Sequence, residues 1–228
     1  PLMNNRRHCL RTLAALGAVH ALPVWAQGDF PQRPIRMLVP FSAGGSPDLM
    51  ARLIAVQLGR QLGQGVVIDN RVGANGIIAG EAIAKAAPDG YNLLVTTGSH
   101  AINPSIYRKL PYDTVQDFTP VSLFSVAPAL TLVVNPAFPA RTFAEFLALA
   151  RKPDGKVSFG SPGTGNTLHL AGELLNATAG THMLHVPYKG AAPALNAVLS
   201  GEVSACFLST TAATLAVRSG QVRPLAVT

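Results

Sequence analysis

The chain has 228 residues, of which 48% are hydrophobic and 13% are charged, so it can bury a core and is not a disordered polypeptide. Its formal net charge is +7, but the basic residues are scattered and no aromatic residues alternate with them, which argues against nucleic-acid binding. Beyond the N-terminal segment, no apolar run approaches the ~18 residues that a membrane-spanning helix needs.

Residues 1–26 have the pattern of an export signal. A basic stretch with Arg6, Arg7 and Arg11 precedes the apolar residues 12–23, and Ala26 supplies the small residue of a cleavage site. The alternative, a retained membrane anchor, is disfavoured because the apolar stretch is too short to span a bilayer. Arg6-Arg7 also resembles a twin-arginine signal, so the export route stays open. We expect a periplasmic protein that begins after Ala26.

Removal of this segment changes the charge and the cysteine count. The remaining chain carries 15 basic and 11 acidic residues, a net charge of about +4. Of the two cysteines, Cys9 leaves with the signal and Cys206 remains alone, so no intrachain disulfide is expected.

The next part of the chain predicts alternating strands and helices. The expected order is strand 35–39, helix 46–62, strand 66–68, helix 77–87 and strand 93–95. Strands and helices that alternate at such short spacing predict right-handed βαβ units and a parallel sheet.

A glycine loop joins the first strand to the first helix. Gly44 and Gly45 let the backbone turn its N–H groups toward one point, and Ser46 is expected to cap the helix with Pro47 at its first position. Unpaired N–H groups and the positive end of the helix dipole together favour an anion. We expect the backbone to approach the ligand at Gly45, in a conformation closed to β-branched residues. The alternative is that the loop is only a tight turn.

The middle of the chain is less regular. Residues 97–103 are expected to form a loop at the carboxyl end of strand 93–95, where open α/β sheets bind ligands, which makes His100 a candidate. Residues 104–120 are predicted to be irregular. Residues 121–134 have a high strand propensity but are too many for one strand, which predicts a segment that leaves one sheet and enters another. Thr142 and Glu145 have the spacing of a capping box for a helix that ends at Ala150.

The same pattern then begins again. The expected elements are strand 157–160, glycine loop 161–167, helix 168–179, strand 183–186, helix 194–199, strand 203–208, helix 212–218 and strand 222–227. Two α/β halves that each open with strand, glycine loop and helix could direct two helix N-termini at one ligand in a cleft.

No catalytic or cofactor motif is complete. The spacing around Ser161 is not that of a nucleophile elbow, no glycine loop ends in Gly-Lys-Ser/Thr, and the histidines lack metal-ligand spacing. We interpret His169, in a helix, and His185, in a strand, as structural. We therefore expect no catalytic residue, metal or cofactor. The alternative function is that of a hydrolase or transferase that binds an anionic substrate group at the glycine loop of residues 43–46. The absence of a base–nucleophile pair in the sequence argues against it.

Motifs of one family occur in order along the chain. They are residues 35–41 with Ala43–Ser46 and Asp48, then 69–71, 86–91, 100–104, 110–113, 117–118, 169–173, 185–190 and 225–228. Together they resemble the tripartite tricarboxylate transporter receptor family, the Bordetella uptake gene (Bug) type of periplasmic solute-binding protein, over residues 30–228.

The resemblance implies an α/β, type II periplasmic-binding-protein fold with two lobes around a cleft, here placed at residues 27–124 and 125–228. It implies a monomeric receptor, not an enzyme, that captures a small mono-, di- or tricarboxylate. The partners would be the large and small membrane subunits of a tripartite transporter. A binding protein that signals to a membrane sensor fits the sequence equally well.

The resemblance also implies a binding site made from two groups of residues. The first lobe would hold one end of the ligand and the second lobe would close over it, with Tyr188 as a wall. The residues are Phe41, Ala43, Gly44, Gly45, Ser46, Asp48, Thr97, Gly98, Ser99, His100 and Ala101 in the first lobe, and Ser161, Gly163, Thr164, Gly165, Asn166, Thr167 and Tyr188 in the second.

The chain departs from the family pattern at three places. Pro47 replaces the usual Thr, and Leu208-Ser209 replaces the Asp-Asn of many members. The missing acid would disfavour amino acids relative to plain carboxylates. Family members continue for roughly another hundred residues, so we expect a truncated first lobe and an unstable fragment with an exposed sheet edge.

We predict that export removes residues 1–26. N-terminal sequencing of the exported protein should give a start near Gln27, and a start elsewhere would contradict the prediction. Replacement of Arg6 and Arg7 by lysine separates the routes, because unchanged export in that double variant would exclude the twin-arginine route while leaving the signal in place.

Overall fold

The computed structural model describes residues 30–126, 129–154 and 156–228. The predicted export signal lies outside these residues. All elements below belong to one compact unit, Arg33–Thr228. Among the described residues, no helix combines the length and the apolar character required to cross a membrane.

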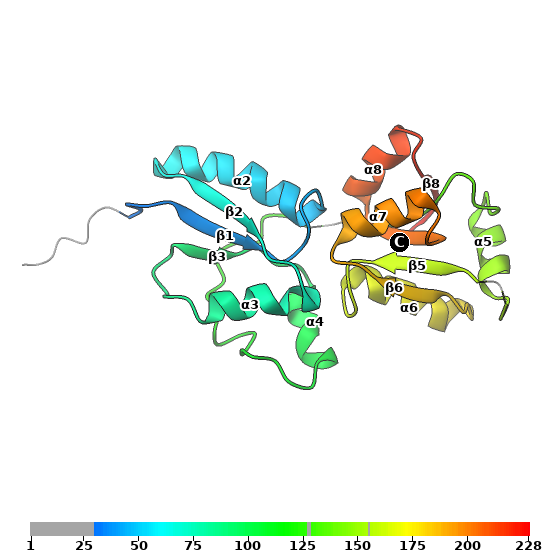
Figure 1. Cartoon of the computed structure of the whole chain (residues 1–228), viewed down its shortest axis with the longest axis horizontal. Helices are drawn as coiled ribbons and strands as arrows, with labels where there is room; N and C mark the ends of the chain where they lie inside the picture. Colours follow the sequence, from blue (N-terminus) through cyan, green and yellow to red (C-terminus); the bar gives the residue numbers. More distant parts are fainter. Residues whose placement is uncertain (1–29, 127–128, 155) are drawn as a thin grey trace, which may run out of the picture. The chain divides into compact units, whose positions relative to one another are not determined.

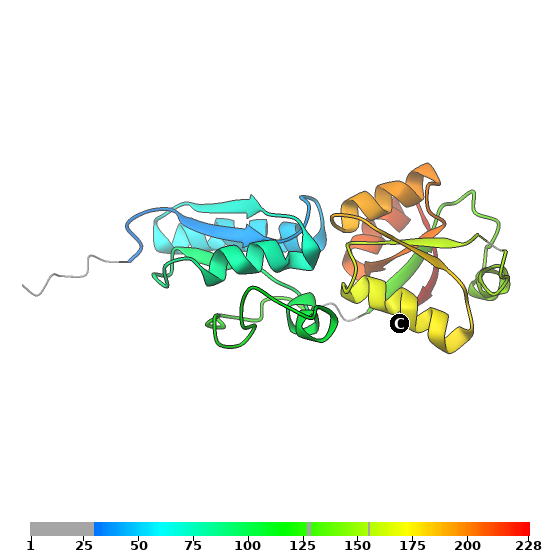
Figure 2. The same ribbon diagram turned by 60° about the horizontal axis from the view of Figure 1, so that its bottom comes forward.

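The first sheet is parallel, as predicted. In the described part of the chain it contains β1 (Ile35–Val39), β2 (Val66–Asn70) and β3 (Asn92–Leu94) in the order β2-β1-β3. Helices α2 (Ser46–Leu62) and α3 (Ile77–Ala84) lie on opposite faces of this sheet (Figures 1 and 2). Met37, Val39, Ala51 and Val95 form the core between α2 and the strands.

The second sheet is mixed. Its strands are β4 (Leu130–Val134), β5 (Ser158–Ser161), β6 (Leu184–Pro187), β7 (Ala205–Ser209) and β8 (Arg223–Val227), in the order β6-β5-β7-β4-β8. Strand β5 runs parallel to β6 and β7, whereas β4 is antiparallel to β7 and β8. The repeated pattern alone did not predict the antiparallel pairs, because β4 precedes the repeat in the sequence.

Four helices accompany the second sheet: α5 (Phe143–Ala150), α6 (Thr167–Ala179), α7 (Ala191–Ser200) and α8 (Thr210–Arg218). Two apolar cores lie against this sheet. One contains Phe146 and Phe159, and the other contains Val198, Val203 and Leu208. The apolar layers on both sides hold the carboxyl ends of β5 and β7 in place.

Three predicted helix-ending glycines and the predicted capping box of α5 are confirmed. Gly63, Gly180 and Gly201 end their helices in the left-handed conformation, where glycine carries no steric cost. At α5 the Glu145 N–H donates to Thr142 Oγ1 at 3.2 Å, and the Thr142 N–H donates to Glu145 Oε2 at 3.3 Å. This is the predicted capping box.

Two predicted segments differ from the structure. Residues 97–103 are not a loop throughout, because helix α4 (Ser99–Ile106) begins after Gly98, and the Ser99 N–H donates to Thr97 Oγ1 at 3.3 Å. Pro104 inside α4 concealed this helix in the sequence. Among the described residues of the run 121–134, only those of β4 form a strand. Residues 121–126 pair with no strand of the described chain, and Leu123 is 82% exposed.

The start of α2 also differs from the prediction. Gly45 occupies the N-cap position and Ser46 is the first helical residue, so the Ser46 hydroxyl does not cap its own helix. Gly44 has a φ of +82°, but Gly45 is extended with a φ of −76°, so the expected special conformation belongs to Gly44.

The buried side chain of Asp48 fixes this glycine loop and does not line the pocket described below. Its side chain is buried and accepts the Gly44 N–H at 3.0 Å, two bonds from Arg52 at 2.9 and 3.0 Å, and one from Asn70 at 2.9 Å. Asn70 also donates to the Phe41 carbonyl at 3.0 Å. Burial raises the pKa of Asp48, but the bonds from Arg52, Gly44 and Asn70 outweigh it, and the net pKa is lowered. The carboxylate therefore stabilises the fold at neutral pH, and this contribution is lost only as the pH falls through its lowered pKa.

We predict that Asp48→Asn lowers the free energy of unfolding by about 2 kcal/mol at neutral pH, because an amide cannot accept all of these bonds and leaves Arg52 without its partner. Glu81→Gln is the control, since the exposed pair of Glu81 with Lys85 should contribute less than about 0.5 kcal/mol. Equal stability of the two variants in urea titrations would contradict the role given to Asp48.

Candidate functional site

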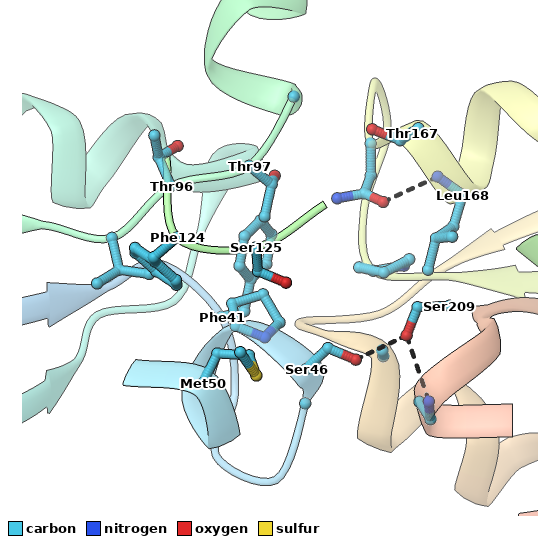
Figure 3. Close-up of a pocket in the computed structure, with 18 of the residues that line it drawn as sticks. Phe41, Ser46, Met50, Thr96, Thr97, Phe124, Ser125, Thr167, Leu168 and Ser209 are labelled. Atoms are coloured by element: carbon cyan, nitrogen blue, oxygen red, sulfur yellow. Dashed lines mark hydrogen bonds between the residues drawn. The ribbon is translucent and has the colours of Figure 1, made fainter. Parts of the chain in front are cut away.

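A pocket of about 640 Å³ lies where strands of both sheets end, a volume typical of small-molecule sites (Figure 3). Residues that follow β1 and β3 line one part of it, and residues that follow β5, β6 and β7 line another. The described lining residues are Phe41, Gly45, Ser46, Pro47, Met50, Leu94, Val95, Thr96, Thr97, Gly98, Ser122, Leu123, Phe124, Ser125, Leu130, Pro162, Asn166, Thr167, Leu168, Ala191, Ser209 and Ala212. None of these is charged.

Helix N-termini converge on this pocket. Five helices, α2, α4, α6, α7 and α8, each place an N-cap or first-turn residue among the described lining residues. They are represented by Ser46, Gly98, Thr167, Ala191 and Ser209. Each helix start carries N–H groups without partners in the helix and the positive end of its dipole. The pocket therefore favours negative charge although no cationic side chain is among these residues.

The walls between the helix starts are largely apolar. Figure 3 shows Phe41, Met50 and Phe124 beside Ser125 and Thr97, with Thr167, Leu168 and Ser209 across the pocket. Such a lining combines polar ends with an apolar middle, which suits a ligand with an apolar body and an anionic group.

Two serines meet at the pocket wall. Ser46 Oγ lies 2.8 Å from Ser209 Oγ, and Ser209 Oγ accepts the Ala212 N–H at 3.4 Å as the cap of α8 (Figure 3). The hydroxyl of Ser46, predicted to cap α2, is therefore linked to the start of α8. Sequence reasoning did not select Ser209, although its place at the end of β7 follows the same rule that selected the other loops.

The predicted second-lobe residues have different roles. Asn166 and Thr167 line the pocket, but Asn166 is only 6% exposed and its side chain is already hydrogen-bonded. Its Oδ1 accepts the Leu168 N–H at 3.0 Å, and its Nδ2 donates to Ser99 Oγ at 3.0 Å. Asn166 therefore orders the start of α6 and offers its amide to other protein groups.

The predicted residues around α4 divide into two groups. Thr97 and Gly98 line the pocket, whereas Ser99, His100 and Ala101 are not among the lining residues. The His100 ring packs edge-on against Phe118, with centroids 4.7 Å apart, and its Nε2 lies 3.2 Å from the Thr114 carbonyl oxygen. The structure places His100 on a helix and against the segment that follows it.

A smaller pocket of about 260 Å³ shares Phe41 and Pro162 with the larger one. It contains the predicted residues Gly163, Thr164 and Tyr188, together with Lys189. Tyr188 donates its hydroxyl to Glu202 at 2.8 Å.

The other predicted residues line neither pocket. These are Ala43, Gly44, Asp48, Ser161 and Gly165. Three of them support the loops: the Gly44 N–H is bound by Asp48, the Gly165 N–H donates to His169 Nδ1 at 3.2 Å, and Ser161 Oγ lies 2.6 Å from His185 Nε2. Contact of any predicted residue with a ligand stays a prediction.

The Ser161–His185 pair is a serine–histidine contact that the sequence did not reveal. Ser161 is fully buried, its Oγ accepts the Gly163 N–H at 3.2 Å, and the His185 ring packs on His169. A nucleophile needs access to a substrate, and this hydroxyl has none in either pocket. The hydrogen bonds of this pair stabilise the loop that follows β5.

Met50, Thr96 and Phe124 also line the pocket without having been predicted. Met50 was assigned to a buried helix face, and Thr96 lies one residue before the predicted loop. Phe124 belongs to the run predicted as β-leaning, and no motif marks it as a site residue.

Comparison with known proteins gives the family. The pattern of the tripartite tricarboxylate transporter family receptor matches residues 50–228. Protein BugT of Bordetella pertussis is 39% identical over 95% of this chain and 68% of its own length.

Two solved structures from Rhodopseudomonas palustris have the same fold. Rpa4515 with adipate is 38% identical with a TM-score of 0.83, over 88% of this chain and 67% of that protein. MatC with bound malate is 31% identical with a TM-score of 0.78, over 87% of this chain and 67% of that protein. The chain thus spans about two thirds of the proteins that it matches.

These matches confirm the α/β fold of two-lobed periplasmic binding proteins, whereas the lobe boundaries at 26/27 and 124/125 stay predictions. The members and neighbours are solute-binding receptors rather than enzymes. The chain belongs to the tripartite tricarboxylate transporter receptor family of periplasmic solute-binding proteins, and its similarity to BugT places it with the Bug type.

Proposed function

We propose that the 640 Å³ pocket binds a small carboxylate through main-chain N–H groups and that the loaded receptor delivers it to a tripartite membrane transporter. The observation that carries this proposal is an uncharged pocket on which the starts of several helices converge. Family membership and the adipate and malate bound to two relatives support the ligand class.

Main-chain donors suffice for this binding. A charge-assisted hydrogen bond contributes roughly 1.5–3 kcal/mol, and a helix start adds about 0.3–1 kcal/mol where water has access. Two or three such bonds give affinities that a transport receptor can use without a cationic side chain. The starts of α2 and α6, at Ser46 and Thr167, are the donors that we assign first.

The lining also limits the rest of the ligand. Met50, Leu94 and Leu168 offer apolar surface, which favours an aliphatic or aromatic body between the polar ends. No acid is among the described lining residues to pair with a ligand ammonium group. The sequence argument rested on Leu208, but this side chain is buried in the core and does not line the pocket. The preference for plain carboxylates over amino acids therefore rests on the lining itself.

The assignment of partners and compartment follows the family. We assign a periplasmic location, a monomeric receptor, and a permease with large and small subunits as the recipient. Delivery to a permease is favoured over signalling to a sensor because the matching family is defined as a transporter receptor.

We predict that adipate binds and that its uncharged diamide of the same length binds at least about a hundredfold more weakly, because the diamide lacks the charge that strengthens the main-chain bonds. Calorimetry on the purified protein measures both, within a panel of mono-, di- and tricarboxylates. 1,6-Diaminohexane is the cationic control. Equal binding of adipate and the diamide, or preferred binding of the diamine, would overturn the proposal.

We also predict that Gly45→Val weakens carboxylate binding about tenfold or more, while the change at the N-cap costs less than about 1 kcal/mol of stability. Gly45 lines the pocket, its φ is compatible with a side chain, and an added Cβ would lie 3.5 Å from the Ser42 carbonyl oxygen, which is an ordinary contact. The new side chain would occupy the position where the ligand approaches the backbone.

Gly44→Val is the matched control one residue earlier. Gly44 has a φ of +82° and does not line the pocket, so this variant should lose about 1–2 kcal/mol of stability. Calorimetry and thermal unfolding separate the two effects. Unchanged affinity in a folded Gly45→Val protein would show that the loop is only a turn.

A further inference from the structure

A pair of histidines lies behind the second glycine loop, residues 161–166. His169 is on α6 and His185 on β6, and their ring centroids are 4.0 Å apart. Neither histidine lines either of the two pockets described above, whereas Pro162 and Asn166 of the loop line the larger one. The pair therefore acts on a ligand only through the loop.

His169 holds the end of this loop by accepting a hydrogen bond. The Gly165 N–H donates to His169 Nδ1 at 3.2 Å, so Nδ1 carries no proton and the neutral ring has its proton on Nε2. His169 Nε2 lies 3.6 Å from Glu173 Oε1. A second proton could enter only at Nδ1, and there it would break the bond to Gly165.

His185 holds the beginning of the same loop. Its Nε2 lies 2.6 Å from Ser161 Oγ, which also accepts the Gly163 N–H at 3.2 Å. The Ser161 hydroxyl has one proton to donate, either to His185 or to the Gly163 carbonyl oxygen at 3.3 Å. A charged His185 would donate to Ser161 and could no longer accept from it, so this arrangement would change.

Both histidines are partly buried, and an aromatic ring packs against them. The buried ring of Phe159 lies against both histidines, at centroid distances of 6.3 Å from His169 and 5.1 Å from His185. Gly172 on α6 permits this approach, because a Cβ at that position would collide with the Phe159 ring. Burial of this kind disfavours the charged form of an imidazole.

Among the described residues, the ionisable groups that shift the pKa values of the pair are its own members and Glu173. Burial lowers the pKa of His185 to about 4, and His169 adds to this effect. Burial also lowers the pKa of His169, although Glu173 opposes the shift. An exposed histidine has a pKa of about 6.5, whereas the pKa of His185 in the folded protein is about 4. Between these two pH values, a form of the protein that exposes the pair binds more protons than the folded form does. Acid therefore favours the form in which the loop is released.

We propose that His169 and His185 are positioning residues that keep the 161–166 loop in its ligand-binding shape only while both imidazoles are neutral, so that acidification lowers the affinity for the solute. This inference rests on the proposed carboxylate site, because the loop contributes Pro162 and Asn166 to that pocket.

The test uses a variant that keeps the hydrogen bonds and removes the titration. In His169→Asn combined with His185→Gln, the amide oxygens lie near the former Nδ1 and Nε2 positions and do not protonate. Calorimetry with adipate near neutral pH and at about pH 5 should show that wild-type affinity falls about tenfold more than that of the variant. The ligand's own titration is common to both proteins and cancels in this ratio. His182→Gln, at an exposed position outside the pair, is the matched control and should behave as wild type.

A second measurement on the wild type needs no ligand. In NMR titrations, the Gly165 and Gly163 amide signals should shift together with the ring signals of His169 and His185, with midpoints below 6.5. Amide signals that do not follow the rings, or rings that titrate at 6.5, would overturn the proposal even if adipate binds. An equal pH dependence of adipate affinity in wild type and double variant would also overturn it. Failure of adipate to bind at neutral pH counts against the proposed function, and the amide titration then still decides the role of the histidines.

Discussion

The first N–H groups of a helix have no partner within the helix, and the starts of several helices of this chain line one pocket. Everything else at the candidate site depends on that constraint. Strands of both sheets end near the pocket, the loops after them are short, and the following helices begin where their donors can meet a ligand. In the function that we propose, an uncharged lining such as that of Ser46, Thr167 and Ser209 attracts an anion.

Short loops rich in glycine do not hold their own shape, and each of the two glycine loops is supported from behind. Asp48 binds the Gly44 N–H and is kept charged by Arg52. His169 binds the Gly165 N–H and is kept neutral by burial. The two supports use opposite electrostatics for the same purpose. Asp48 has a lowered pKa and stays charged in mild acid, whereas the pKa values of both imidazoles are lowered by burial, which favours their neutral form.

Much of the fold was predictable because its signals are local. Capping residues such as Thr142 and Gly180 and the alternating apolar runs identified most elements within a few residues. The antiparallel place of β4 and the helix that begins at Ser99 were not predictable, because the first depends on pairing with distant strands and the second contains Pro104. For the site, position after a strand drew attention to Gly45, Thr97 and Thr167, and all three line the pocket. It could not separate Asn166, whose amide is used by the protein, from residues with free donors.

A crystal structure of this chain with adipate tests the central claim most directly. The account predicts a carboxylate group in the 640 Å³ pocket with its oxygens about 3 Å from main-chain nitrogens at the starts of α2 and α6. A carboxylate bound instead to the side chain of Lys189, with no main-chain N–H within hydrogen-bonding distance, would contradict it.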